Sequence, residues 1–461
     1  MGLTRTFSIY FYAISVNFLS YGGGLGYGWS SPALPKLSSI SEKDHNPLPR
    51  PATPSEQSLI ASLLSLGAVC SPFLSEIASD KLGRKTTLLL FSLPMIGGYI
   101  ILIFADTVFQ FYVARFLIGI TEGCIFSIIP VYSAEISEDH NRGTIGAMML
   151  LFVAIGHFTS STVGPNVTIR TFSIVSLIPC VIFFIIFGLF SPESPYFYVL
   201  KNKNDEAEEC LMKLRRKRNV DDEMKEIVKS VTEIKAGVEK SSIKSLFTEI
   251  SCIKTFVLAL LLMLFQQFTG LIYIIDYTQK IFDTANTPLS GDKSVMIVMT
   301  VQVLAILIST NIIDKINRRF LLLLSFTVIC LLHVILGLFF YLVDHQYHLD
   351  GISWLPIVCL MLFIVAFQSG IGPISYIFPT EILEPNVKSV GNMLVICIGL
   401  VAEFLIATFL PEMAGEIGFY MPFWVFAAVT FVAVGFVYFF IPETRGKSFL
   451  EIQKDVRAKI I

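Results

Sequence analysis

The chain has 461 residues, of which 54% are hydrophobic and only 15% are charged, and its mean hydropathy is +0.70. A soluble domain needs about 25% charged residues to cover its surface, so this composition excludes an ordinary soluble protein and indicates a membrane protein. The formal net charge of −2 carries little information by itself. We expect no nucleic-acid partner.

Crossing the ~30 Å hydrocarbon core takes about 20 apolar residues in a helix. The sequence predicts twelve such helices, so we expect an all-α membrane protein embedded in the lipid bilayer. The first stretch lacks a signal-peptide cleavage pattern and is interpreted as a spanning helix. In chain order the stretches are 8–28, 57–78, 86–105, 109–133, 144–163, 171–190, 255–282, 293–314, 320–343, 353–378, 389–411 and 419–441.

Positive charge is concentrated on one side of this alternating topology. The positive-inside rule therefore predicts that both termini are cytoplasmic, and we expect the protein in the plasma membrane. The basic residues on this side are Arg84, Lys85, Arg142, the stretch 213–218, the stretch 315–319, Lys388 and the stretch 445–459.

The topology divides the chain into four parts. We expect an N-terminal six-helix bundle over 1–195, a cytoplasmic helical linker over 196–252, a second six-helix bundle over 253–445 and a cytoplasmic tail over 446–461. A proline-rich extracellular loop is expected at 36–56. For the strongly charged linker, a solvated connection and an ordered helical subdomain both fit the pattern.

The sequence Asn166-Val-Thr168 is an N-glycosylation acceptor on the predicted outer side. Its loop is short, which favours an unmodified Asn166. The eight cysteines lie in predicted helices or on the cytoplasmic side, so no disulfide framework follows from them.

Three short charged motifs each occur twice, in the same order and at nearly the same offset. Such a repeat predicts two duplicated, pseudo-symmetric six-helix halves. The repeated motifs are Asp80-Lys-Leu-Gly-Arg84-Lys85 and Asp314-Lys-Ile-Asn-Arg318-Arg319; Glu135, seven residues before Arg142, and Glu381, seven before Lys388; and Ser-Pro-Glu193-Ser-Pro and Ile-Pro-Glu443-Thr-Arg.

Carboxylates and guanidiniums at the cytoplasmic ends of these helices can pair across neighbouring helices. We expect such pairs when the cytoplasmic face is packed shut, so that they favour an outward-open state. Solvated charges that obey the positive-inside rule are the alternative, but they do not explain the repeated spacing. The predicted gating residues are Asp80, Arg84, Glu135, Arg142, Glu193, Asp314, Arg318, Glu381, Lys388 and Glu443.

These motifs resemble those of the sugar porters of the major facilitator superfamily. The resemblance covers roughly 8–455 and implies alternating access, with the substrate held between the halves near the midplane. The motifs most like the facilitative glucose transporters are Asp80-x-x-Gly-Arg-Lys85, Pro130-Val-Tyr-x-Ala-Glu135-Ile, Gln266-Gln267-x-Thr-Gly270 and Pro442-Glu-Thr-Arg-Gly-Lys447. Those most like the insect facilitated trehalose transporters are Trp29-Ser-Ser-Pro-Ala-Leu-Pro35, Pro192-Glu-Ser-Pro-Tyr196 and Asn386-Val-Lys388-Ser389.

The resemblance assigns sugar binding to the paired glutamines of the seventh helix, which are Gln266 and Gln267 here. Two amides in an otherwise apolar helix are costly to bury without partners, and each offers donors and an acceptor that suit a polyol. A hydrogen bond between helices is the alternative role.

Elsewhere the expected pocket departs from the family. Leu150 and Ile272 occupy positions where the family has a glutamine and an asparagine. Losing two or three hydroxyl partners, at about 1 kcal/mol each, would weaken monosaccharide binding by one to three orders of magnitude. The pocket therefore suits either a sugar or a less polar or larger solute. Other positions that differ from the family are Gln302, Gln368, Tyr376, Gly399 and Leu400. Of these, Gln302, Gln368 and Tyr376 are predicted to bind the substrate together with the glutamine pair.

Unusual polar residues are also predicted inside the membrane. His157 is expected to face the cavity, either as a substrate or pH-sensitive contact or in a hydrogen bond between helices. Asp276 and Tyr277 are expected at the outer gate, where Asp276 replaces a family tyrosine and could bind a substrate cation or face outer water. For Glu122 we expect an ion pair with Arg115 on the same helix.

The sequence favours facilitated diffusion over proton coupling. Proton-coupled relatives have an aspartate after the Gly-Tyr pair of the first helix, whereas Gly28 follows Tyr27 here. Glu403, His157 or Asp276 could replace that acid.

The predicted function is facilitative transport of a sugar, trehalose or a hexose, by alternating access. A transporter or proton symporter of another small solute is the alternative, and a non-transporting solute sensor is a third. The sequence contains no nucleotide-binding loop or catalytic constellation, so we expect no enzyme, no cofactor and no metal. We expect a monomer to suffice.

Overall fold

The computed structural model is built from helices joined by turns and loops in the residues that it describes. These residues are 2–39, 46–138, 141–217, 219–238, 243–285, 287–312, 315–347, 349, 351–384, 387–445 and 447. Asp314 and nearly all of the predicted tail over 446–461 lie outside them.

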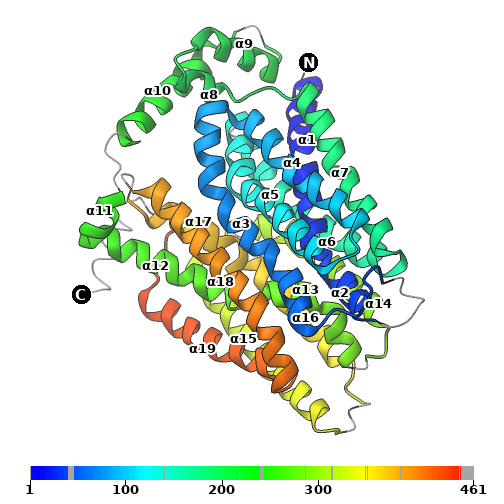
Figure 1. Cartoon of the computed structure of the whole chain (residues 1–461). Helices are drawn as coiled ribbons and strands as arrows, with labels where there is room; N and C mark the ends of the chain where they lie inside the picture. The colour runs from blue at the N-terminus through cyan, green and yellow to red at the C-terminus, as the bar shows by residue number, and fades with distance from the viewer. Residues whose placement is uncertain are drawn as a thin grey trace.

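The first half of the chain forms one helical bundle (Figure 1). The first spanning segment is longer than predicted, because α2 continues α1 to Ser38 and removes three residues from the expected loop. This pair packs against α6 and α7 and so belongs to the bundle. The helices are α1 (Gly2–Gly28), α2 (Ser30–Ser38), α3 (Pro54–Leu82), α4 (Arg84–Phe104), α5 (Val108–Ile136), α6 (Arg142–Val163) and α7 (Ile169–Phe190), with a 3-10 turn η2 (Gly164–Asn166) after α6.

The second half repeats this arrangement with two of its spanning segments broken. The predicted helices over 255–282 and 353–378 are each interrupted near the middle, at 268–270 and at 370. The helices are α12 (Ile250–Gln267), α13 (Leu271–Thr284), α14 (Gly291–Ile312), α15 (Arg318–Asp344), α16 (Leu355–Ser369), α17 (Ile371–Ile382), α18 (Lys388–Glu416) and α19 (Met421–Phe440).

The break after α12 requires glycine. Gly270 has φ +77°, a left-handed conformation that L side chains rarely adopt, and a Cβ atom there would lie 2.4 Å from the ring of Phe426. Helix α12 therefore ends on Gln266 and Gln267, and α16 ends one residue after Gln368. Both breaks follow directly on predicted site residues.

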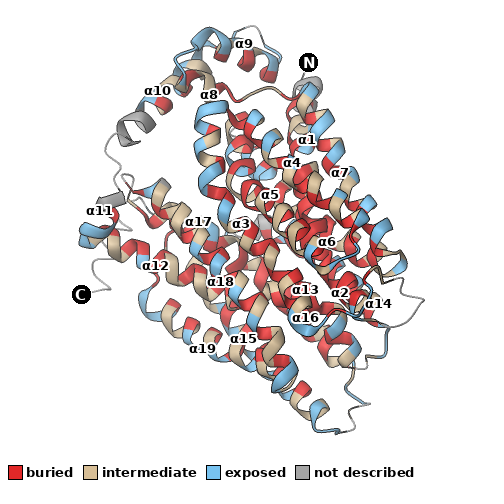
Figure 2. Ribbon diagram, in the orientation of Figure 1, coloured by how far each residue is buried: buried red, intermediate tan, exposed pale blue. Residues whose placement is uncertain are grey.

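The distribution of apolar residues matches a membrane environment. Eleven segments of the described residues are long and apolar enough to span a bilayer, and α1 with α2 supplies the twelfth. Exposed positions lie on the outward faces of the helices (Figure 2). Many of them are apolar, such as Leu189 on α7 and Phe431 on α19. Serine, threonine and glutamine side chains are buried between the helices instead. Contact with lipid explains this pattern.

Close helix crossings hold the first half together. A Cβ atom at Gly67 would lie 2.2 Å from the carbonyl oxygen of Phe116, and one at Gly119 would lie 2.0 Å from that of Leu64. The backbones of α3 and α5 thus touch, as small residues allow in membrane proteins. This contact fixes α5, which carries Arg115 and Glu122.

The described part of the linker is helical. It consists of α8 (Pro195–Leu200), α9 (Asn204–Arg215), α10 (Asp221–Val238) and α11 (Ile243–Thr248). α8, α9 and α10 pack around a small apolar cluster of their own, whereas α11 packs against α12. The buried Arg215 donates to the carbonyl oxygens of Ile136 and Ser137 and forms an ion pair with Glu223 at 2.6 Å. Arg215 therefore anchors α9 to the end of α5.

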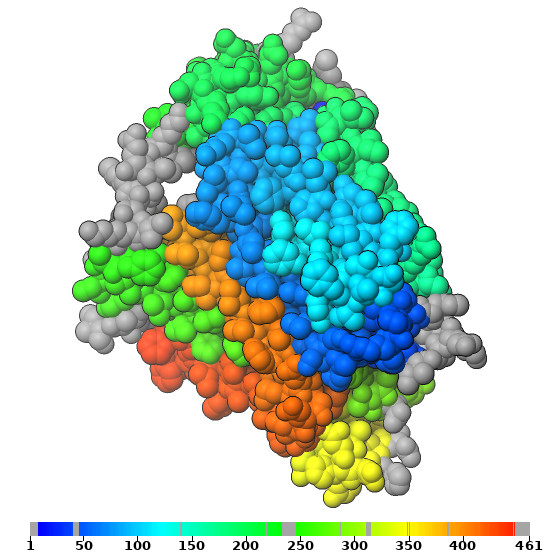
Figure 3. All heavy atoms as spheres, viewed as in Figure 1, coloured from blue at the N-terminus to red at the C-terminus, as the bar shows by residue number. Residues whose placement is uncertain are grey.

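The two halves meet along helices that lie far apart in the sequence. α3 packs against α18, α6 against α14 and α2 against α13, and the first of these contacts is visible in Figure 3. Ser58 on α3 donates to the carbonyl oxygen of Thr408, and Ser55 donates to Glu412 at 2.8 Å. These hydrogen bonds lie toward the end of the molecule opposite α8–α10, which we call the distal end; the end that carries α8–α10 is the linker end.

Candidate functional site

Gln266 and Gln267 lie at the break between α12 and α13 and are 5% and 7% exposed. The side-chain oxygen of Gln266 is buried and accepts no hydrogen bond from the described residues. An unpaired buried amide costs about 1–3 kcal/mol, which a hydroxyl group of a bound solute would recover. The glutamine pair is therefore prepared for a hydroxylated ligand.

Gly399 on α18 faces this pair. A Cβ atom at Gly399 would lie 2.8 Å from Cγ of Met263 and 3.6 Å from Nε2 of Gln267. The glycine therefore lets α18 pack closely against Met263 and presents no side chain to Gln267.

His157 and Gln302 form a polar link between the halves. Nδ1 of His157 on α6 lies 3.1 Å from the side-chain oxygen of Gln302 on α14, and both side chains are buried. Nε2 of His157 has no hydrogen-bond partner in the described residues. The structure thus supports the interhelical hydrogen bond that the sequence offered as one role of His157, while Nε2 is left available for a solute.

Glu403 forms the second polar link. Its Oε1 accepts hydrogen bonds from Ser65 on α3 at 2.7 Å and from Tyr27 on α1 at 3.4 Å. Tyr27 also packs edge-on against His157, with ring centroids 6.3 Å apart. Both donors belong to the first half and the acceptor to the second, so these bonds exist only while the halves are in contact. Sequence analysis found Glu403 but missed Tyr27 and Ser65.

The predicted ion pair between Glu122 and Arg115 is absent from the described residues. Arg115 donates instead to the carbonyl oxygens of Gly26 and Ile60 and to the hydroxyl of Ser30. Both carboxylate oxygens of Glu122 are buried without a hydrogen-bond partner. The prediction failed because backbone carbonyls of neighbouring helices satisfy the guanidinium.

The repeated charged motifs make equivalent contacts in the two halves. Arg84 at the start of α4 pairs with Glu135 at the end of α5 at 2.9 Å, and Arg318 at the start of α15 pairs with Glu381 at the end of α17. Glu193 accepts from the backbone of Lys85 at 3.0 Å, and Glu443 accepts from that of Arg319, the equivalent residue, at 3.1 Å. The duplication seen in the sequence is therefore also a duplication of interactions.

These pairs differ from the expected gate in one respect. Both partners of each pair belong to the same half, so the pairs form without the halves meeting at the linker end. Asp80 lies 3.8 Å from Arg84 but is mostly exposed. Arg142 and Lys388 are exposed at the starts of α6 and α18. Asp314 lies outside the described residues.

The remaining pocket candidates lie on both halves, and one of them contacts the opposite half. Tyr376 stacks on Phe126 of the other half, with ring centroids 6.4 Å apart and planes 13° apart. Gln368 is buried at the end of α16. Leu150 and Ile272 are half-buried and pack against the hydrophobic core.

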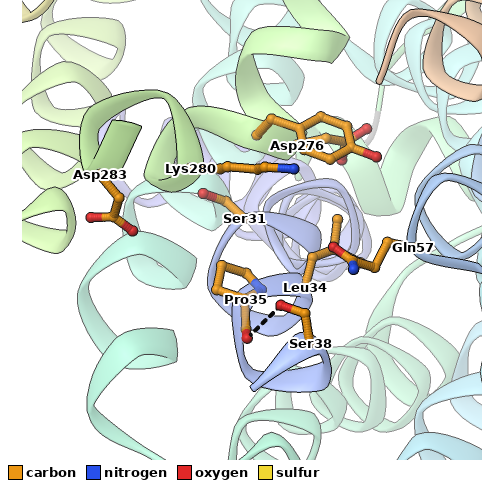
Figure 4. A pocket seen from close by; sticks show the side chains of 9 residues that line it. Ser31, Leu34, Pro35, Ser38, Gln57, Asp276, Lys280 and Asp283 are labelled. Carbon is orange, nitrogen blue, oxygen red and sulfur yellow. Dashed lines mark hydrogen bonds between the residues drawn. The ribbon is translucent and has the colours of Figure 1, made fainter. Parts of the chain in front are cut away.

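Asp276 and Tyr277 lie at the distal end on α13, where they line a cavity against α2 (Figure 4). This position agrees with the predicted outer gate, although the gate role itself stays a prediction. Asn166 is exposed in η2 at the same end, where its amide donates to the carbonyl oxygen of Thr162 at 2.8 Å.

Glu249, Cys252 and Glu384 form one cluster of metal-type ligand atoms at the linker end. The thiol of Cys252 lies 3.6 Å from Glu249 and 3.4 Å from Glu384 and can donate its one proton to either carboxylate, while Ser251 donates to Glu384.

The sequence profile described as "Sugar (and other) transporter" matches residues 16–456. This match spans both halves, the linker and every candidate residue above. The chain belongs to this transporter family. It is accordingly a multi-pass membrane protein and not an enzyme.

Two insect proteins are among its relatives. The facilitated trehalose transporter Tret1 of Polypedilum vanderplanki is 28% identical over 450 residues, covering 97% of this chain and 88% of the relative. The protein of the same name from Culex quinquefasciatus is 29% identical over 456 residues, covering 99% and 87%.

The fold is shared with solved sugar transporters. The xylose transporter XylE from E. coli in a partially occluded inward open conformation superposes with a TM-score of 0.74 at 18% identity, covering 95% of this chain and 99% of XylE. Its inward open conformation gives a TM-score of 0.74 at 19% identity, covering 96% and 99%. These similarities confirm the two six-helix halves predicted from the repeat and the major facilitator fold implied by the resemblance.

Proposed function

We propose that the protein is a facilitative transporter of a sugar, trehalose or a hexose, and that it works by alternating access. The observation that carries this proposal is the buried glutamine pair at the break of α12, with one amide oxygen still unpaired. A polyol can donate to that oxygen and accept from the amide groups at once. The names of the insect relatives agree with a disaccharide as substrate.

Alternating access is supported by where the halves touch. Hydrogen bonds from Ser55, Ser58 and Ser65 join the halves toward the distal end, whereas the ion pairs of the linker end lie within each half. Breaking the former set would open the distal end while each bundle stays intact. The residues of the site come from both halves of one chain, so a monomer is sufficient.

We place the linker end in the cytoplasm and the protein in the plasma membrane. Basic residues at the linker end include Arg84, Arg142, Lys213, Arg215 and Arg318. The positive-inside rule then puts both termini in the cytoplasm and Asn166 outside.

Uptake of radiolabelled trehalose and D-glucose into proteoliposomes tests the proposal. We expect saturable uptake of at least one sugar that does not need a pH gradient. Gln267→Ala should lower the apparent affinity about 5- to 30-fold, because one or two hydrogen bonds of about 1 kcal/mol are lost. The exposed Gln346→Ala is the matched control and should transport like the wild type. Absence of uptake of both sugars, or unchanged affinity in Gln267→Ala, would contradict the proposal.

Proton symport is a second candidate, and the unpaired Glu122 is the observation that favours it. A carboxyl group that is buried without partners is far less costly as a neutral acid than as an anion. If Glu122 releases its proton during the cycle, an inward proton gradient will stimulate uptake, and Glu122→Gln will abolish that stimulation. Uptake that is equal with and without the gradient would exclude this candidate.

A further inference from the structure

A cavity lies at the distal end, between the two halves. It has a volume of about 250 Å³ and is lined by residues of α2 and α13, with Gln57 of α3 (Figure 4). Its walls belong to different halves of the protein, because α2 is part of the first bundle and α13 part of the second.

The floor of the cavity carries buried polar groups. Asp276 is 3% exposed and Tyr277 is 4% exposed. The hydroxyl of Tyr277 has no hydrogen-bond partner in the described residues. Leaving such a group unpaired costs about 1–3 kcal/mol, so the cavity contains one polar group that a ligand could satisfy.

The mouth of the cavity carries both signs of charge. Lys280 and Asp283 are exposed, and in Figure 4 the Lys280 side chain passes over Ser31 with its ammonium group directed toward the side of Asp276. Lys280 is in none of the ion pairs found among the described residues. Its ammonium group can donate to an oxygen of a solute, while Asp283 can accept from one.

Charges of both signs surround the cavity. Asp276 and Asp283 line it together with Lys280, while Arg115 interacts electrostatically with Asp276 and Asp292 with Asp283. Such a mixed set of donors and acceptors suits a neutral ligand with several hydroxyl groups. The volume lies below the ~300–1,000 Å³ of pockets that enclose drug-sized ligands, so it fits one sugar ring and not two.

We propose that this distal cavity is a second solute site, which binds a single sugar ring or a polyol of similar size. This proposal rests on the proposed function, because the membrane topology given there places the distal end outside the cell and makes the cavity accessible from outside. Because the ligand contacts α2 and α13 together, its binding stabilises the state in which the distal ends are in contact. Solute outside the cell would then oppose opening of the distal end.

Equilibrium binding of radiolabelled D-glucose to the full chain in lipid nanodiscs tests the site. All proteins carry Gln267→Ala to weaken the central site. We expect saturable binding to persist in this background and to weaken at least tenfold, about 1.4 kcal/mol, on adding Tyr277→Phe or Lys280→Ala. The matched control is Lys293→Ala, an exposed lysine at the same end, which should change binding less than twofold.

Two outcomes would overturn the proposal. One is that the Gln267→Ala protein binds no D-glucose although its thermal unfolding is the same as that of the wild type. The other is binding that neither Tyr277→Phe nor Lys280→Ala weakens. If the uptake assay fails but D-glucose binding depends on Tyr277 and Lys280 as expected, only the proposed transport function is refuted. The two failures are therefore distinguishable.

Discussion

Glu403 is predicted to hold the distal ends of the two halves together. Glu403→Leu removes the acceptor of the Ser65 and Tyr27 hydrogen bonds, which measure 2.7 and 3.4 Å. A hydrogen bond of this kind contributes about 1 kcal/mol net, and two of them are lost. A total of about 2 kcal/mol would shift the equilibrium between closed and open distal ends about 30-fold toward the open state.

A cysteine placed in the contact reports on this equilibrium. Ser58 is fully buried against the carbonyl oxygens of Ala407 and Thr408, so Ser58→Cys should react with an external, membrane-impermeant maleimide only when the distal end opens. We expect Glu403→Leu to raise the labelling rate about 30-fold and Glu403→Gln, which keeps an acceptor, to raise it less. The exposed Glu416→Leu on the same helix is the control. Equal rates in Glu403→Leu and the control would refute the reasoning.

Two further predictions concern the stability of the scaffold. Gly119→Ala should lower the free energy of unfolding by about 1–3 kcal/mol, because its Cβ atom would lie 2.0 Å from a backbone oxygen. Gly97→Ala is the control and should not lower it, because a Cβ atom there would have nothing within 4 Å. Thermal unfolding in detergent compares the two variants. Burial, reinforced by Glu193, raises the pKa of Cys210 to about 12, so this thiol stays protonated and unreactive to maleimide at pH 7–8. Arg215→Ala, which frees α9 from α5, should make Cys210 reactive, whereas Lys213→Ala, at an exposed position, should not. If Cys210 stays unreactive in Arg215→Ala, the anchoring role of Arg215 is contradicted.

Features that depend on local sequence were predictable. Each spanning segment is identified by a run of apolar residues. In lipid the backbone polar groups can be satisfied only within the segment, so such a run is expected to be a helix. The contacts of Arg84 and Arg318 follow from a repeat that is visible in the sequence. The glutamine pair stands out because polar amides interrupt an apolar helix.

Features that depend on contacts between distant segments were not predictable. Ser65 and Glu403 are 338 residues apart in the chain, and a buried serine in a membrane helix is too common to mark a partner. The error at Glu122 has a related cause. Spacing on one helix suggested Arg115, but the carbonyl oxygens that bind Arg115 belong to other segments, and sequence does not show which carbonyls are accessible.

The break between α12 and α13 has a mechanical consequence. Helix α13 has 14 residues and is about 21 Å long, so it is a lever arm whose pivot lies at Gly270. A rotation of about 10° at that pivot would move the far tip by roughly 4 Å, because displacement grows with distance along the arm. Gln266 and Gln267 adjoin the pivot, and Lys280 and Asp283 lie near the tip. A sub-ångström adjustment around the solute would thus be amplified into a movement large enough to open or close the passage to the outside.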